Sequence, residues 1–206
     1  MSTIVDISMT IHENMPIYPG NQELEVKREE SNTSHISTLK FGSHTGTHMD
    51  APAHTFEDED GIGKIDLNRC IGECTVLDMT HIEFGEGIDV KDLKGQEIDT
   101  GDRILFKTKN SNRSYDSFYK DFVYLENEAA EFLSSRDPTL IGIDYMSIKK
   151  KGREDNTAHT AFLKAGIPII EGLDLSKVKP GEYKLIALPI KIKNLDASPV
   201  RAVLIT

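Results

Sequence analysis

Tryptophan is absent from the 206-residue sequence, cysteine occurs only twice, and no apolar run reaches the roughly 20 residues of a membrane-spanning helix. Cys70 and Cys74 are too few for a disulfide framework, and their C-x3-C spacing differs from the C-x-x-C redox signature, so we expect both to be reduced. Residues 1–7 lack the cationic start and the apolar core of a signal peptide. These absences predict a cytoplasmic protein with no membrane partner.

Positive charge is scarce as well. The sequence holds 24 Lys and Arg against 34 Asp and Glu, which gives a net charge of −10. Residues 149–151 (KKK) form its only dense cationic run, whereas nucleic-acid binders usually carry a basic patch. The G-x-G-x-x-G and P-loop motifs of nucleotide-binding proteins are missing too. We therefore expect a small-molecule substrate rather than a nucleic acid.

What the sequence does contain is enough apolar material, 38% of residues, for an ordinary core. Its length predicts a single domain over residues 1–206. Apolar spacing predicts helices near 122–132 and 157–165. An extended segment and short strands are predicted at 36–50, 74–79, 103–108, 140–146, 167–170, 183–192 and 200–205. Because strands outnumber helices, the expected fold class is α/β, with mixed β-sheets and a few helices rather than a doubly wound sheet.

The most informative segment is HTGTHMDAPAH at 44–54, which holds three of the seven histidines and one aspartate. Its glycine, β-branched threonines and proline all oppose a helix. On an extended chain alternate side chains share a face, so His44, His48 and Asp50 would project together. Imidazoles and a carboxylate converging on one point are the ligands expected for Zn, Mn or Fe(II). The segment therefore predicts a metal site.

Two later residues are further candidates. Glu171 follows the apolar run 167–170, and a buried carboxylate is costly unless it is paired or binds a metal. His159 lies in the first turn of the preceding predicted helix, from which it could face the same end of the sheet. The pattern alone leaves two roles open for each, a metal ligand or a capping or ion-pairing residue.

The acidic run at 57–60 suggests a calcium loop, but the first and last ligand positions would fall on Phe56 and Leu67, which cannot serve. A solvated acidic loop is the better interpretation. His12, His35 and His81 have no partners in the sequence pattern and are interpreted as structural.

The 44–54 segment resembles the H-x-G-T-H-x-D-x-P-x-H signature of the cyclase family of metal-dependent hydrolases, which includes bacterial kynurenine formamidase and isatin hydrolase. Residues 6–8 and 16–20 are similar to the N-terminal segment of that family, and residues 171–192 and 196–204 are similar to its C-terminal segment. The resemblance thus covers nearly the whole chain. It implies the swivelling β/β/α fold and a homodimer or higher homo-oligomer.

The resemblance also implies two divalent metal ions per chain. Zinc is the first candidate for the metal and manganese the second. By position, His44, His48 and Asp50 would bind the first ion. Asp50, His159 and Glu171 would bind the second, with Asp50 and Glu171 able to bridge the pair.

In the same way, His54 matches the general acid/base of the family. Tyr18 occupies the position of an aromatic residue, usually tryptophan, that contacts the substrate in kynurenine formamidases.

The implied function is an amidohydrolase that uses a metal-bound hydroxide on a small aromatic formamide, with N-formylkynurenine as the first candidate. Alternatives are hydrolysis of a cyclic amide or imide of the isatin type, a cyclisation, or a non-catalytic metal- or ligand-binding protein. His54 argues against the last, because a binder needs no further titratable group beside a filled site.

Overall fold

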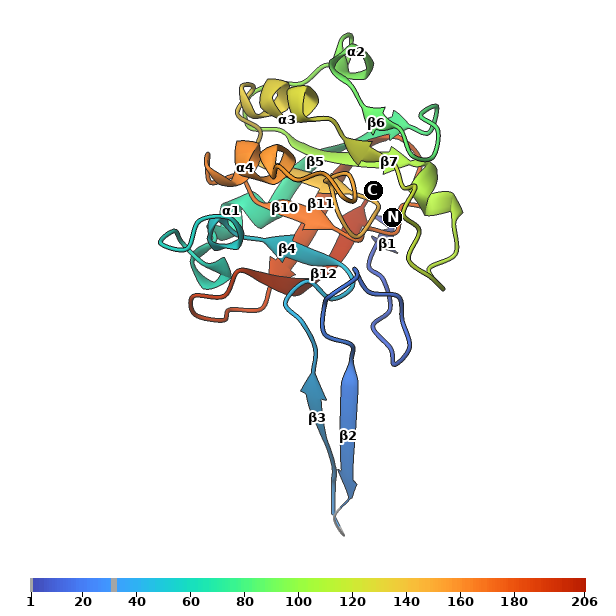
Figure 1. The fold of residues 1–206 in the computed structure, drawn as a ribbon, viewed down its shortest axis with the longest axis vertical. Coiled ribbons are helices and arrows are strands. Elements are labelled where there is room, and N and C mark those ends of the chain that lie inside the picture. The colour runs from blue at the N-terminus through green and yellow to red at the C-terminus, as the bar shows by residue number, and fades with distance from the viewer. Residues whose placement is uncertain (1, 31–32) are drawn as a thin grey trace.

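A computed structural model describes residues 2–30 and 33–206, and its centre is an eight-stranded sheet (Figure 1). The strands are β1 (Ile4–Asp6), β4 (His48–Asp50), β5 (Ile71–Met79), β7 (Arg103–Thr108), β9 (Leu140–Ile143), β10 (Ile169–Glu171), β11 (Gly181–Pro189) and β12 (Ala197–Ile205). Their order is β1-β12-β11-β5-β7-β9-β10-β4, and β12 also pairs with β4. This extra pairing closes the sheet into a barrel-like ring.

The sheet is mixed, as the sequence predicts. Three pairs are parallel: β5 with β7, β7 with β9, and β9 with β10. The other pairs are antiparallel: β1 with β12, β11 with β12, β11 with β5, β4 with β10, and β4 with β12. A parallel pair needs a crossover connection, and the segment that contains helix α4 (Thr157–Leu163) provides it between β9 and β10. The α/β class with few helices is confirmed.

The remaining helices are short and include three 3-10 turns. They are α1 (Leu67–Cys70), α2 (Val90–Leu93), α3 (Asn127–Ser134), η1 (Pro52–His54), η2 (Ile62–Lys64) and η3 (Lys109–Asn112). Helices α3 and α4 lie side by side over one face of the sheet (Figure 1), where Ser134 Oγ donates to the carbonyl of Ala161 at 2.6 Å. Within residues 2–30 and 33–206, none of the helices has both the length and the apolar character that crossing a bilayer requires.

Apolar side chains form two main cores on either side of the sheet. One core lies between the sheet and the helices and includes Ile143, Leu133 and Phe162. The other is enclosed by the ring of strands and includes Met49 and Ile170. Cys70 and Cys74 are buried in this second core as free thiols, as the sequence predicts.

The predicted helix at 122–132 is wrong at its N-terminal half. Tyr124 and Leu125 form strand β8, which pairs in parallel with β6 (Gly87–Ile88). The amide of Glu126 then donates to the carbonyl of Ile88 at 3.0 Å, so this backbone is committed to the small sheet and the helix begins only at Asn127. A tertiary strand pairing overrides the local helical spacing here.

The predicted extended segment at 36–50 is interrupted by a turn. Its first part is β3 (His35–Lys40), which forms a hairpin with β2 (Glu25–Glu30). Figure 1 shows this hairpin projecting away from the sheet and helices. Its strands are largely exposed, so no alternation of buried and exposed residues marks them in the sequence.

Candidate active site

Strand β4 presents two of the predicted metal-binding residues because it is fixed on both edges. It pairs with β10, where Glu171 lies opposite His48, and with β12. Met49 and Ile170 point into the enclosed core. Because side chains alternate along a strand, His48, Asp50 and Glu171 project together from the opposite face.

His44 reaches the same cluster from a turn, not from an extended strand as the sequence suggests. Gly46 in this turn has a φ of +63°, a conformation that favours glycine. The backbone of Gly172 lies so close that an added Cβ there would be 2.5 Å from the Gly46 carbonyl oxygen. Thr47 Oγ1 secures the contact by donating to the carbonyl of Gly172 at 2.5 Å. The turn, rather than strand alternation, brings His44 to Asp50.

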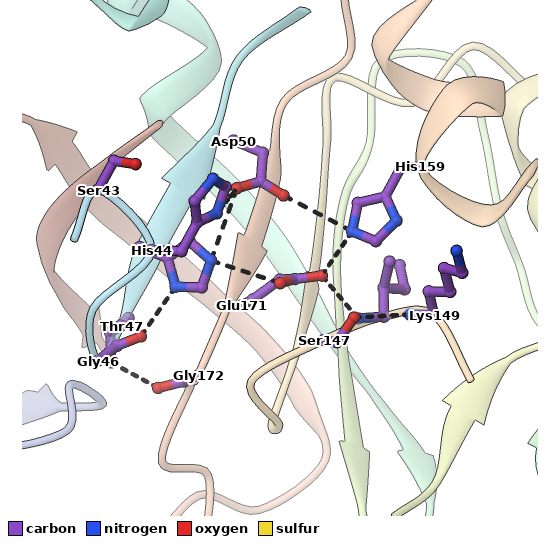
Figure 2. A network of polar contacts seen from close by, with 12 residues as sticks. Ser43, His44, Gly46, Thr47, Asp50, Ser147, Lys149, His159, Glu171 and Gly172 are labelled. Carbon is purple, nitrogen blue, oxygen red and sulfur yellow. Dashed lines mark hydrogen bonds and ion pairs between the residues drawn. The ribbon is translucent and has the colours of Figure 1, made fainter. Parts of the chain in front are cut away.

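The side chains of the turn and of β4 converge around Asp50 (Figure 2). Asp50 Oδ1 lies 2.9 Å from His44 Nδ1 and 3.6 Å from His48 Nε2. His48 Nδ1 donates to the carbonyl of Gly46 at 2.9 Å, which fixes the ring so that Nε2 faces the two carboxylates. The Oε2 atom of Glu171 lies 3.4 Å from this nitrogen. His48 therefore faces both Asp50 and Glu171.

His159 and Glu171 complete the cluster from α4 and β10. His159 Nε2 lies 3.1 Å from Glu171 Oε1 and 3.8 Å from Asp50 Oδ2. The amide of Ile148 also donates to Glu171 Oε1 at 2.6 Å. Burial and the charge of Asp50 oppose ionisation, but the hydrogen bond from His159 and the nearby imidazole of His48 hold the pKa of Glu171 below its usual value. His159 thus faces the carboxylates rather than capping its helix.

The donor set fits a divalent cation. Asp50 is completely buried, and in the described part of the chain neither of its carboxylate oxygens nor Nε2 of His48 has a hydrogen-bond partner. Unpartnered buried polar atoms are costly, and a bound metal ion would satisfy all three. Two ligands of a tetrahedral zinc ion lie about 3.3 Å apart. The 3.4 and 3.6 Å separations at His48 are close to that value.

His54 lies beside these residues at the end of η1 and is half-buried. Its ring centroid is 4.3 Å from that of His44 and 5.3 Å from that of His159. The pKa of His54 is lowered, mainly by burial and also by the charges of His44 and His159. The negative charges of Asp50 and Glu171 raise it by less. The ring is therefore held neutral and able to accept a proton.

Asp196 also belongs to the site, although no sequence pattern predicts it. Its Oδ2 accepts hydrogen bonds from His44 Nε2 at 2.9 Å and from Ser43 Oγ at 3.2 Å. Its hydrogen bond with His44 lowers the pKa of Asp196 to about 2. Burial disfavours charge on His44, but Asp50 and Asp196 outweigh it and raise the pKa of His44 to about 10. A carboxylate on the far nitrogen fixes the orientation of an imidazole, which makes Asp196 a positioning residue.

A cavity of about 230 Å³ opens onto this cluster. Its lining includes Tyr18, His44, His54, Lys149, His159 and Glu171. The ring of Tyr18 meets that of Phe118 edge to face, with centroids 5.3 Å apart. Typical sites for drug-sized ligands measure about 300–1,000 Å³, so this cavity suits a small substrate.

The other histidines lie outside the cluster. His12, His35 and His81 are exposed, as their lack of partners in the sequence pattern suggests. The acidic run at 57–60 is exposed as well, and its only ion pair within the described chain joins Asp60 to Lys64 at 2.6 Å.

Comparison with known proteins places the chain among metal-dependent hydrolases. The family model described as "Putative cyclase" matches residues 5–150. A kynurenine formamidase of Erythrobacter litoralis is 37% identical over 205 residues, covering 98% of this chain and 93% of that protein. The corresponding protein of Bacillus cereus is 32% identical over 204 residues, covering 97% of this chain and 96% of that protein.

Solved structures agree with the sequence relatives. The structure described as "predicted metal-dependent hydrolase from Bacillus stearothermophilus" is 33% identical and superimposes with a TM-score of 0.90, covering 100% of this chain and 98% of that one. Isatin hydrolase A from Ralstonia solanacearum shares the fold, with a TM-score of 0.87 at 22% identity, covering 100% of this chain and 92% of that one. From the family match and the near-complete alignment with these relatives, the chain belongs to the cyclase family.

Proposed function

We propose that the chain hydrolyses the formamide bond of a small aromatic formamide and that N-formylkynurenine is its substrate. The chain is an enzyme, a metal-dependent hydrolase that acts on carbon–nitrogen bonds. The substrate proposal is supported by the two kynurenine formamidases that align over nearly all of the chain.

One observation carries the catalytic part of the proposal. Among the described residues, neither carboxylate oxygen of buried Asp50 accepts a hydrogen bond, and the imidazoles of His44, His48 and His159 converge on them next to a cavity that His54 lines. In our proposal, His44, His48 and Asp50 hold one divalent ion, and Asp50, His159 and Glu171 hold a second. A divalent ion in such a site supplies a water of lowered pKa and a Lewis acid that polarises the carbonyl.

The chain's own residues would handle the proton and the substrate ring. His54 takes up a proton as the carbonyl is attacked and delivers it to the departing amine nitrogen, because an anilide leaves poorly without that proton. Tyr18, held edge to face against Phe118, presents its ring to the aromatic part of the substrate. Asp196 keeps the imidazole of His44 in place through its hydrogen bond to Nε2.

The direct test is turnover of N-formylkynurenine by protein whose metal content has been brought to two ions per chain with zinc or manganese. We expect kcat/KM of about 10⁴ M⁻¹s⁻¹ or more, within the normal enzyme range. A background rate with the metals demonstrably bound would exclude this substrate. Isatin and other cyclic amides would then be assayed, and Tyr18 in place of tryptophan would be the first residue to examine.

We also propose that the chain works as a homo-oligomer, with the β2–β3 hairpin as a contact between copies. The hairpin projects from the rest of the molecule (Figure 1), and Ile36 and Leu39 on it are 60% and 56% exposed. A two-stranded hairpin without packing partners is only marginally stable in water. Because side chains alternate along a strand, Ile36 and Leu39 lie on opposite faces, and Val26 lies opposite Leu39 on the same face. A second copy of the chain that covers the face of Leu39 would stabilise the hairpin.

Replacing Leu39 with aspartate is therefore expected to shift the protein toward monomer, because a charge would enter an apolar contact. Sedimentation velocity or light scattering would report the mass. Leu67→Asp is a matched control, since Leu67 is also 56% exposed but lies on α1, away from the hairpin. An unchanged mass in Leu39→Asp, or an equal loss in both variants, would remove the hairpin from the interface.

A further inference from the structure

Lys149 is the only lysine or arginine that lines the cavity of the active site in the described part of the chain. It belongs to the cationic run 149–151, which the proposed reaction does not use. The preceding residues hold it in place, because the amide of Ile148 donates to Glu171 Oε1 at 2.6 Å and that of Lys149 to Ser147 Oγ at 3.2 Å. In Figure 2 its side chain extends from this segment on the side of His159.

The ammonium group of Lys149 is not needed to neutralise the buried acids. No ion pair joins Lys149 to a carboxylate among residues 2–30 and 33–206, whereas Glu171 and Asp50 are already approached by the imidazoles of His48 and His159. Lys149 is nevertheless half-buried. A partly desolvated cation without a protein partner attracts an anion more strongly than one in open water.

A second ammonium group contacts Tyr18, a residue of the cavity wall, without lining the cavity itself. Lys151 Nζ sits 4.1 Å from the ring centroid of Tyr18, within the range of a cation–π contact. The contact adds positive charge behind the ring that we expect to meet the substrate. Lys150 lies between the two in the sequence, but its Nζ is 5.1 Å from the ring centroid of Tyr124.

The amide side chain of Asn156 adds a neutral donor to this wall. Asn156 is the residue before α4, yet its side chain makes no capping hydrogen bond, because Asp155 Oδ1 accepts from the amide of Thr157 instead at 3.1 Å. The free amide lines the cavity together with Lys149. An ammonium and an amide on one wall are suitable donors for a carboxylate.

We propose that Lys149 is a specificity-determining residue that binds a carboxylate carried by the substrate, so that the enzyme selects aryl formamides that carry a carboxylate over those that lack one. The proposal rests on the proposed function for the reacting formamide. It goes further by naming the charge that the remote end of the substrate must carry and the residue that recognises it.

The test compares two formamides that differ by one group, N-formylkynurenine and N-formylkynuramine, which lacks only the carboxylate. A hydrogen bond between charged groups is worth about 1.5–3 kcal/mol, or roughly 10- to 150-fold in affinity. In Lys149→Gln, we expect the preference for N-formylkynurenine, as a ratio of kcat/KM values, to fall by about that factor. The loss should appear in KM rather than kcat, because the interaction is remote from the reacting bond.

Two further variants separate this role from a general effect of charge. Lys149→Arg keeps the positive charge and is expected to retain most of the preference. Lys150→Gln removes the same charge from the neighbouring position outside the cavity and is expected to leave the preference unchanged. An equal fall for both substrates in Lys149→Gln, or no fall for either, would overturn the proposal.

Calorimetric binding of the corresponding amines, kynurenine and kynuramine, provides a readout without turnover. Wild-type protein should bind kynurenine more tightly, and Lys149→Gln should remove the difference. Protein that hydrolyses neither formamide but still distinguishes the amines would refute the proposed reaction and support the carboxylate site. Equal affinity of wild-type protein for both amines would refute the carboxylate site whatever the reaction.

Discussion

Asp50→Asn should remove at least one of the two divalent metal ions and, with it, hydrolysis. Asp50 is shared by both proposed ion sites, and its two buried oxygens have no hydrogen-bond partner in the described residues. Asparagine has nearly the same shape but no charge, and its amide nitrogen is not a metal ligand. Metal content measured by mass spectrometry after equilibration with zinc should therefore fall from two ions per chain to none or one.

Thermal unfolding provides an independent measurement of the same loss. A ligand at 100 times its Kd stabilises the folded chain by about 2.7 kcal/mol. For a chain of this size that raises Tm by about 5–11 °C. Wild-type protein should show this rise when zinc is added, and Asp50→Asn should show little. Asp58→Asn, in the exposed acidic loop, is the matched control and should respond like the wild type. Full metal content in Asp50→Asn would contradict the proposed ligand set.

His54→Ala should keep its metal and lose about 10²–10⁴-fold in kcat, the usual contribution of a general acid/base. The ring of His54 lines the cavity next to His44 and His159, and burial keeps its pKa low, so a neutral imidazole faces the substrate. Rates and metal content should be measured on the same sample. A loss of rate without a loss of metal identifies a proton carrier, whereas a loss of both identifies a ligand.

The control for this variant is His81→Ala. His81 is exposed, and among the described residues its imidazole forms one ion pair, with Asp92 at 3.3 Å. Its removal should leave both rate and metal content unchanged. If His54→Ala instead loses metal in proportion to activity, His54 is a ligand. That outcome has a structural basis, because a nitrogen of His54 lies within 4.8 Å of ligand atoms of Asp50 and His159.

The sequence predicts best those elements that bury an apolar run. Strand β7 begins and ends at the predicted residues 103 and 108, because its side chains are mostly buried and leave a continuous apolar signal. The β2–β3 hairpin has no such signal, since it packs on neither core and both of its strands are largely exposed. The sequence therefore predicts only the β3 part of it, as an extended segment.

The site shows the same limit. The five predicted metal-binding residues lie in one cluster, because the motif at 44–54 and the end of an apolar strand are local features. Their role as ligands stays a prediction. Asp196 begins the 196–204 segment that resembles the family, but its role is not predicted because it meets His44 across 152 positions of sequence. The turn that delivers His44 likewise depends on a distant contact between Thr47 and Gly172.

The pairing of β4 with β12 also has a consequence for the order of biosynthesis. Every candidate ligand lies at or before residue 171, yet β4 is held on one edge by residues 197–199. A nascent chain that ends before residue 197 thus contains all five proposed ligands, while the strand that carries two of them still has a free edge. For the proposed ligand set, metal capture with the full geometry would have to wait until β12 has been synthesised and has closed the ring. Premature termination would therefore yield a chain with the whole motif but without a rigid site.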